Sequence, residues 1–242
     1  MRTLAVTAAL LLAACGGGAQ TSEPASTPAA SSAAYPPADR PVAEIVSPVW
    51  NSPAVRDRAD ESGQLVRALG ITAGMTVADV GAGSGYHTTR LSPVVGQGGR
   101  VLAQDVNGRY LDDLRRTVAD AGLANVTVIG GTPDDPRLPP RSTDVALLVH
   151  MYHEIESPYA FMARLAPAMK AGGKVAVVDL DRPTHLHGTP PALLRCELAA
   201  VGYQETAFRP LQGDIGYVAV FTPPAEAPAP RAVQPCRNPD RR

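Results

Sequence analysis

A short apolar segment that runs directly into three closely spaced glycines constrains the fold of this 242-residue chain most. Residues 75–80 are apolar enough for a buried strand, and Gly81, Gly83 and Gly85 follow at once. Glycines let the backbone turn sharply and approach a ligand closely. The next helix, expected at residues 84–94, would direct unpaired amides and its positive dipole end at that ligand. The segment therefore predicts a buried strand, a ligand-binding turn and a helix.

Further strand-like and helix-like segments alternate along the middle of the chain. Strands are expected at residues 100–105, 125–129, 143–149, 174–180, 203–209 and 215–221. Helices are expected at residues 56–69, 108–121, 157–171 and 189–202, with Pro167 breaking the last turn of the third. Such alternation predicts an α/β fold: a Rossmann-like, doubly wound, mostly parallel seven-stranded sheet with a C-terminal antiparallel hairpin. In such sheets ligands bind beyond the carboxyl ends of the strands, where strand order reverses.

The glycine spacing separates two kinds of nucleotide site. A dinucleotide fingerprint would place a third small residue at position 86, which is Tyr86 here, so a dinucleotide oxidoreductase is disfavoured. Instead the third glycine comes one residue early, and Asp79 lies two residues before the first. This pattern resembles motif I of class I S-adenosylmethionine-dependent methyltransferases. The resemblance implies S-adenosylmethionine as cofactor and methyl transfer as the reaction.

The later strand ends extend the resemblance over about residues 41–222. Asp105 ends the second strand, where an acid accepts hydrogen bonds from both ribose hydroxyls. Thr132 stands where the family has an acid beside the adenine, which leaves that contact to Thr132, to backbone amides or to Asp134. His150 ends the fourth strand, in a segment with which the family lines its cofactor site. The resemblance therefore assigns cofactor binding to Asp79, Gly81, Gly83, Gly85, Asp105, Thr132 and His150.

Candidate catalytic groups follow the fourth strand. If the acceptor is a hydroxyl or an amine, a base would help to remove its proton. Tyr152, His153 and Glu154 are the first candidates, followed by His185 and His187 after the fifth strand; for each, a hydrogen-bonded loop residue is the alternative. The histidines lack a pair at helical spacing, so no metal site is expected, and His87 is expected to be a turn or packing residue.

The charge of the chain limits the kinds of partner that the protein is expected to bind. The formal net charge is -1, and no basic stripe offers itself to a phosphate backbone, so nucleic acid is not an expected partner. A small-molecule acceptor is expected, but the sequence does not identify it. Nothing in the sequence indicates an oligomeric state.

The first fifteen residues have the layout of an export signal. Arg2 precedes an apolar run at residues 4–12, and Cys15 follows two alanines. This end resembles the lipobox of bacterial lipoproteins, which implies a signal peptide at residues 1–14 and a membrane-anchoring lipid on Cys15. The resemblance implies a location in the bacterial cell envelope, facing the periplasm, and Gly16 weakly favours the outer membrane.

Composition divides the residues that follow the predicted signal peptide into three segments. Residues 15–40 are almost all Gly, Ala, Ser, Thr or Pro and are expected to form a disordered tether. The methyltransferase-like domain is expected at residues 41–222 and a Pro-rich tail at residues 223–242. Cys196 and Cys236 are the two cysteines left for a disulfide in an oxidising compartment, although Cys196 could be a small buried residue and Cys236 a free thiol.

Export conflicts with the implied reaction, because S-adenosylmethionine is made in the cytoplasm. The alternative function is therefore a non-catalytic envelope lipoprotein that uses the same fold as a nucleoside-binding or scaffold module. The intact glycines and Asp105 favour a retained cofactor site over this alternative.

Overall fold

The computed structural model describes residues 34–45 and 52–237, which belong to one compact unit. The predicted signal peptide, the predicted lipid on Cys15 and most of the predicted tether lie outside the described residues. Within the described part of the chain, no helix is both long enough and apolar enough to cross a membrane.

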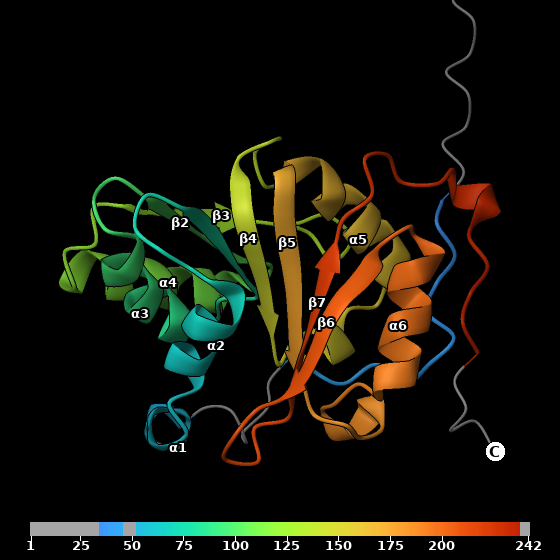
Figure 1. Ribbon diagram of the computed structural model, residues 1–242, viewed down its shortest axis with the longest axis horizontal. Coiled ribbons are helices and arrows are strands. Elements are labelled where there is room, and N and C mark those ends of the chain that lie inside the picture. The colour runs from blue at the N-terminus through green and yellow to red at the C-terminus, as the bar shows by residue number, and fades with distance from the viewer. Residues whose placement is uncertain (1–33, 46–51, 238–242) are drawn as a thin grey trace, which may run out of the picture. The chain divides into compact units, whose positions relative to one another are not determined.

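A single seven-stranded sheet forms the centre of this unit (Figure 1). Its strands are β1 (Thr76–Val80), β2 (Arg100–Asp105), β3 (Val126–Gly130), β4 (Thr143–Val149), β5 (Met169–Asp179), β6 (Gln204–Pro210) and β7 (Tyr217–Thr222). The spatial order is β3-β2-β1-β4-β5-β7-β6. Strands β1 to β5 pair in parallel, whereas β7 pairs antiparallel with both β5 and β6. The predicted fold class is therefore confirmed, with the antiparallel hairpin at one edge.

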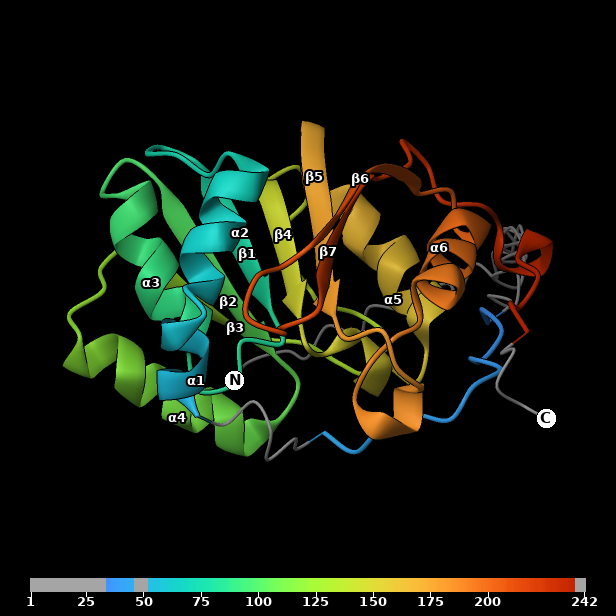
Figure 2. The same cartoon turned by 60° about the horizontal axis from the view of Figure 1, so that its bottom comes forward.

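Helices cover both faces of the sheet (Figures 1 and 2). They are α1 (Pro53–Arg58), α2 (Glu61–Leu69), α3 (Tyr86–Val95), α4 (Gly108–Asp120), α5 (Pro158–Leu165) and α6 (Pro191–Ala200), with short 3-10 helices η1 (Tyr152–Glu154), η2 (Ala166–Ala168), η3 (Thr184–Leu186) and η4 (Pro230–Ala232). Helices α2, α3 and α4 pack on one face, and α5 and α6 pack on the other.

The core follows from the alternation of side chains along each strand. In β1, Val77 packs with Leu65 of α2 and Leu91 of α3, whereas the neighbouring Ala78 packs with α5 and α6. Because both faces are covered, nearly every residue of β1, β2 and β4 is buried, and most of their interior positions are apolar. This explains why short apolar runs in the sequence predicted the central strands.

The first helix differs from the prediction. The sequence predicts one helix over residues 56–69, but the chain forms α1 and α2 with a break at Asp60, whose φ is 48°. The side-chain amide of Gln64 donates a hydrogen bond to the carbonyl of Ala59, which lies in the break. The break turns α1 toward the carboxyl end of the sheet, where Arg56 reaches the cavity described below.

The segment around Pro167 also differs in part. As predicted, the α-helix does not continue through Pro167: α5 ends at Leu165, and Pro167 lies in η2. Met169, however, was expected in that helix and instead begins β5, five residues before the predicted start of the strand. Its register with β4 shifts between Thr143 and Val145, which accommodates the glycine turn that follows Met169.

Both ends of the expected domain continue into packed chain. Tyr35, expected in the tether, donates its hydroxyl to the carbonyl of Pro228 in the expected tail. Arg40 is buried. Cys236 forms the predicted disulfide with Cys196 of α6, which confirms that pairing. Composition alone did not reveal these contacts, because each depends on one side chain within a stretch of small residues and prolines.

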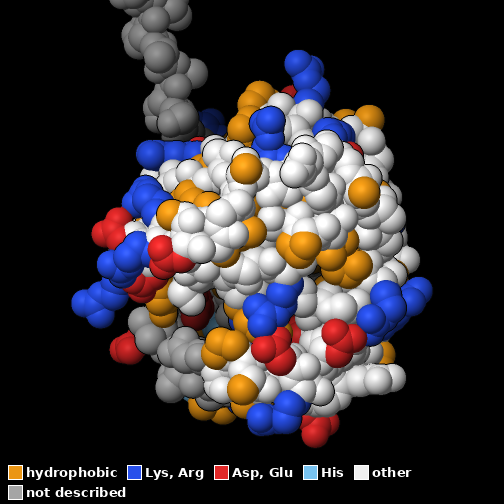
Figure 3. All heavy atoms as spheres, turned by 90° about the vertical axis from the view of Figure 1, so that its left-hand side faces the viewer, with side chains coloured by type: hydrophobic (Ala, Val, Ile, Leu, Met, Phe, Trp, Pro, Cys, Tyr) orange, Lys and Arg blue, Asp and Glu red, His pale blue; other side chains and the backbone are white. Residues whose placement is uncertain are grey.

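Charged side chains are mixed on the surface that carries α3 and α4. Figure 3 shows basic and acidic side chains interspersed among uncharged ones on that side of the molecule. Three of its ion pairs join Arg90 to Asp57, Arg115 to Asp112 and Arg116 to Asp113.

Candidate active site

A cavity of about 210 Å³ lies at the carboxyl end of the sheet, where the strand order reverses between β1 and β4. The loops after β1, β2 and β4 supply most of its walls, and α1 and η1 complete it. Its lining residues include Arg56, Gly81, Ala82, Gly83, Ser84, Tyr86, Gln104, Asp105, Tyr110, Pro133, His150, Met151, Glu154 and Phe161.

The glycine turn forms the floor of this cavity. Gly81 and Gly83 have φ values of 70° and 55°, which favour glycine, and both line the cavity. A Cβ on Gly81 would lie 2.8 Å from Cγ of Met151, whereas a Cβ on Gly83 would meet no atom within 4 Å. Gly83 therefore leaves open space over its backbone, as close approach of a ligand requires. Gly85 lies outside the lining and packs toward Leu114 of α4.

Asp105 lines the cavity at the end of β2, as predicted. Asp105 is 5% exposed, and one of its carboxylate oxygens accepts a hydrogen bond from the amide of Gly83 at 2.8 Å. The other accepts from the amide of Asn107 at 2.8 Å. Burial raises the pKa of Asp105, and these backbone hydrogen bonds act against that rise. The carboxylate is thus fixed beside the glycine turn, where it can accept from a sugar hydroxyl.

Besides Gly85, two predicted cofactor residues, Asp79 and Thr132, do not line the cavity. Asp79 is buried in β1, where it accepts a hydrogen bond from the hydroxyl of Thr88 at 2.6 Å, and burial raises its pKa to about 6. It supports the glycine turn from within the fold. The hydroxyl of Thr132 donates to Asp134 at 2.8 Å, and its neighbour Pro133 lines the cavity in its place. Contact of these two side chains with the cofactor therefore stays a prediction.

His150 does line the cavity, and it belongs to a buried network that sequence reasoning missed. Its Nε2 lies 2.6 Å from Oε1 of Glu61, the first residue of α2. The other oxygen of Glu61 pairs with Nε of Arg56, and Nη2 of Arg56 lies 2.6 Å from Nε2 of His87. Arg56 lines the cavity, so the network presents a guanidinium to a ligand there. His87 is buried at the base of α3, which agrees with its predicted packing role.

The electrostatics of this network keep Glu61 ionised. Burial alone would raise the pKa of Glu61, but the hydrogen bond from His150 and the charges of His150 and Arg56 lower it to about 2. Burial lowers the pKa of His150, although Glu61 opposes that shift. No sequence motif marks Arg56 or Glu61, because they reach the strand ends only through the break at Asp60.

The three first catalytic candidates occupy η1 but point in different directions. Tyr152 is fully buried, and its hydroxyl donates to Glu197 of α6 at 2.9 Å, so a catalytic role does not fit its position. His153 is also fully buried, with Nδ1 3.0 Å from the carboxylate of Asp179. Neither residue lines the cavity, whereas Glu154 does.

Glu154 has an unusual environment for a carboxyl group. Its pKa is raised to about 8 by burial and by the nearby carboxylates of Asp105 and Asp179. A carboxyl group whose pKa lies near neutrality is suited to accept or donate a proton. Of the five candidate catalytic residues, Glu154 alone combines this chemistry with a place in the cavity wall.

The two catalytic candidates after β5, His185 and His187, lie in different environments. His185 is exposed on η3. His187 ends that turn in a left-handed conformation, with φ 59°, and its ring packs edge-on against His153 with ring centres 5.4 Å apart. His187 therefore joins the loop after β5 to η1.

The cavity fits the cofactor that the sequence implies. The open space over Gly83, the fixed acceptor Asp105 and the guanidinium of Arg56 match a group with a sugar and an amino-acid end. Gly81, Gly83, Asp105 and His150 would hold that group, and it would supply an activated methyl group on a sulfonium.

Comparison with known proteins supports the same assignment. The family model described as "Methyltransferase domain" matches residues 77–173. A ubiquinone/menaquinone biosynthesis C-methyltransferase from Shewanella pealeana is 26% identical over 121 residues, which are 50% of this chain and 48% of that protein. The chain spans about half the length of the curated relatives that it matches.

Solved structures share the fold at low identity. An S-adenosylmethionine-dependent methyltransferase from Aquifex aeolicus superposes with a TM-score of 0.61 and 22% identity, covering 70% of this chain and 96% of the other. The [4+2]-cyclase SpnF superposes with a TM-score of 0.57 and 16% identity, covering 65% of this chain and 62% of the other. At these identities the likeness describes the fold.

The matched segment begins in β1, passes through both loops that hold the cavity's glycines and Asp105, and ends in β5. Residues 77–173 are therefore similar to a methyltransferase domain, in a chain with the Rossmann-like fold of methyltransferases whose cofactor is S-adenosylmethionine.

Proposed function

We propose that this protein transfers a methyl group from S-adenosylmethionine to a small-molecule acceptor. The carrying observation is the cavity at the switch point, where Gly83 and Asp105 are joined by a hydrogen bond in the segment that matches the methyltransferase domain. Because the sulfonium is already activated, the protein mainly has to align the methyl carbon with the acceptor and exclude water. A residue near the cavity that takes a proton would help a hydroxyl or amine acceptor, and Glu154 has that position.

The donor half of the reaction has the stronger support. The matched segment contains the loops after β1, β2 and β4, which line the cavity. The acceptor is left open, since the chain spans only half of relatives named for quinone biosynthesis. Phe161, Ile155 and Met151 give the cavity an apolar wall, which favours an acceptor with an apolar part.

Calorimetry on the full chain tests the donor assignment. We expect S-adenosylhomocysteine to bind at least about tenfold more tightly than NAD, a difference of ~1.4 kcal/mol. Equal or tighter binding of NAD would remove the proposal. Transfer of labelled methyl groups from S-adenosylmethionine to envelope extracts then tests turnover.

A binding module without turnover is the second candidate. The observation that favours it is the disulfide between Cys196 and Cys236, because an oxidising compartment lies outside the cytoplasm, where S-adenosylmethionine is made. Tight binding of S-adenosylhomocysteine without methyl transfer to any extract would favour this candidate.

We further propose that the protein is exported and lipid-anchored through Cys15 to the bacterial envelope, facing the periplasm. The disulfide between Cys196 and Cys236 supports export, because disulfides persist in oxidising compartments. Replacing Cys15 by serine should move the protein from the detergent phase to the aqueous phase. An unmodified mature N-terminus elsewhere, seen by mass spectrometry, would contradict this proposal.

A further inference from the structure

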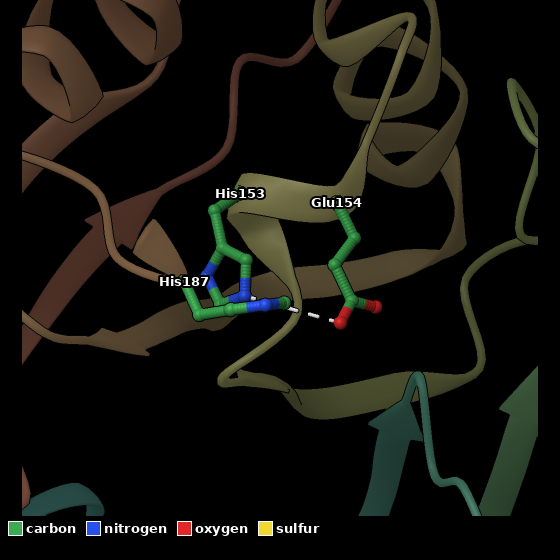
Figure 4. Close-up of side chains that lie close together, drawn as sticks. All are labelled: His153, Glu154 and His187. Atoms are coloured by element: carbon green, nitrogen blue, oxygen red, sulfur yellow. Dashed lines mark ion pairs between the residues drawn. The ribbon is translucent and has the colours of Figure 1, made fainter. Parts of the chain in front are cut away.

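Three side chains with metal-binding atoms converge beside the cavity (Figure 4). His153 and Glu154 come from η1, and His187 comes from the loop after β5. One ligand atom from each lies within 4.8 Å of the others. Figure 4 shows both imidazole rings and the carboxylate directed toward one another.

His153 is prepared to offer one nitrogen. Its Nδ1 lies 3.0 Å from both carboxylate oxygens of Asp179, a position from which Nδ1 donates to that carboxylate and Nε2 points to the opposite side of the ring. Nε2 is buried, has no hydrogen-bond partner among the described residues, and lies 3.9 Å from Oε1 of Glu154. A buried ring nitrogen without a partner is rare in folded proteins, and a bound ion is one of the explanations for it.

Asp179 holds the ring of His153 in this orientation. One of its oxygens accepts from the hydroxyl of Thr189 at 2.7 Å, and the other accepts from the amide of Leu180 at 2.9 Å. A carboxylate that fixes the far nitrogen of a histidine is the usual second partner of a metal-bound imidazole.

His187 supplies a second imidazole from a separate element. Its Nδ1 is buried and also lacks a hydrogen-bond partner within the described part of the chain. Its left-handed backbone, uncommon outside glycine, turns the ring back toward His153. His187 thus brings a second imidazole nitrogen within 4.8 Å of the ligand atoms of His153 and Glu154.

Carboxyl groups adjoin this cluster on two sides. Those of Asp179 and Glu154 lie 3.0 and 3.9 Å from the ring nitrogens of His153. Among residues 34–45 and 52–237, no lysine or arginine forms an ion pair with any of them. A divalent cation would compensate this charge.

We propose that His153, His187 and Glu154 bind a divalent transition-metal ion of the zinc type. Two imidazoles and one carboxylate are a ligand set of catalytic zinc sites, which keep a fourth position open for water or substrate. The imidazoles exclude a site built for magnesium, which prefers oxygen ligands. Since Glu154 also lines the cavity, the site adjoins the place where a methyl acceptor would lie, a part of the inference that rests on the proposed function. With the metal bound, Glu154 would act as a ligand and no longer as the group that takes the acceptor's proton.

Metal binding by the full chain tests the site directly. The protein is stripped with a chelator and dialysed against zinc, and bound metal is counted; cobalt in place of zinc reports the ligand field by its visible absorption. We expect one equivalent per chain. Asp179→Asn should weaken zinc binding by about 10–100-fold, as loss of a second partner does. His187→Ala and Glu154→Gln, which remove ligands, should weaken it more.

His185→Ala is the matched control, because His185 lies on the same turn with an exposed side chain. It should leave zinc affinity unchanged. Less than one equivalent in the wild type, or equal affinity in His187→Ala, would overturn the proposal. Binding of S-adenosylhomocysteine is measured separately: if the wild type binds zinc but not this nucleoside, the metal site stands and the methyl-transfer proposal falls.

Discussion

The amide of Gly83 donates a hydrogen bond to the carboxylate of Asp105 at 2.8 Å, which joins the loop after β1 to the end of β2. Asp105 therefore has two tasks at once. It holds the glycine turn through the amide of Gly83, and it lines the cavity. Removing the carboxylate should loosen the turn and remove a contact with the ligand together.

The first prediction concerns this residue. Asp105→Ala should weaken binding of S-adenosylhomocysteine by ~1.5–3 kcal/mol, since a hydrogen bond to a charged group is worth about that much. Calorimetry on the two full-length proteins measures the difference. Asp120→Ala, an exposed acid at the end of α4, should bind as the wild type does. Unchanged affinity in Asp105→Ala would mean that Asp105 serves the turn alone.

The parts of this fold that depend on neighbouring residues could be predicted from local sequence patterns. Strands buried on both faces select apolar residues, which made β1, β2 and β4 predictable. Positive φ values select glycine, which made the glycine turn predictable. No such local pattern marks the break at Asp60. The apolar positions Leu65 and Leu69 continue the helical period, whereas the break is stabilised by contacts such as that between Gln212 and Gln64, 148 residues apart.

The candidate site also contains residues that the sequence could predict and residues that it could not. Asp105 and His150 were predictable as strand-end residues, because parallel strands bring their ends to one edge. Arg56 and Glu61 were not, since only the packing of α1 and α2 places them there. The cluster of His153 with His187 escaped for a related reason: 34 residues separate the two, and no helical spacing links them. The direction of Tyr152 depends on Glu197, which no local pattern indicates.

Acid should destabilise the fold through Glu61. Because its pKa falls from the ordinary value of 4.5 to about 2 on folding, the ionised carboxylate stabilises the protein above pH 4.5. That contribution, at most about 3 kcal/mol, is lost as the pH falls from 4.5 through about 2. Urea unfolding of the wild type and Glu61→Gln at pH 7 and pH 3 measures it: the difference in the free energy of unfolding should shrink at pH 3.

The control for this experiment is Glu226→Gln, which changes an exposed carboxyl in the C-terminal segment. Its free energy of unfolding should match the wild type at both values of pH. If the difference between wild type and Glu61→Gln were the same at pH 7 and pH 3, the pKa of Glu61 would not be lowered by folding.

The disulfide should stabilise the packed C-terminal segment. Cys196 and Cys236 are 40 residues apart, and closing a loop of that length is worth roughly 4 kcal/mol in the chain-entropy treatment. Cys236→Ser should lower the free energy of unfolding by about this amount. The double variant with Cys196→Ser should lose no more than the single one, because the bond is already absent. Labelling of two free thiols in non-reduced wild type would contradict the pairing.

The last prediction concerns the buried ion pair between Arg40 and Glu197. Arg40 Nε lies 3.0 Å from Oε1 of Glu197, and both side chains are fully buried. The same guanidinium donates to the carbonyls of Tyr152, His153 and Ile155, so it also fixes the 3-10 helix η1. This contact makes a residue of the expected tether part of the site's support.

Arg40→Ala should therefore lower the free energy of unfolding by about 3–5 kcal/mol, because it leaves Glu197 buried without its partner. Arg40→Lys keeps the charge but lacks the planar fork that reaches three carbonyls. It should therefore lower the free energy of unfolding somewhat less than Arg40→Ala does. Adding Glu197→Gln to Arg40→Ala should recover part of the loss, since the uncompensated charge is then gone. Urea unfolding of the wild type, Arg40→Ala, Glu197→Gln and the double variant completes the cycle, and Arg40→Lys is measured beside them. Additive losses would show that the two side chains do not interact, and a loss below about 1 kcal/mol in Arg40→Ala would place this residue in a solvated tether after all.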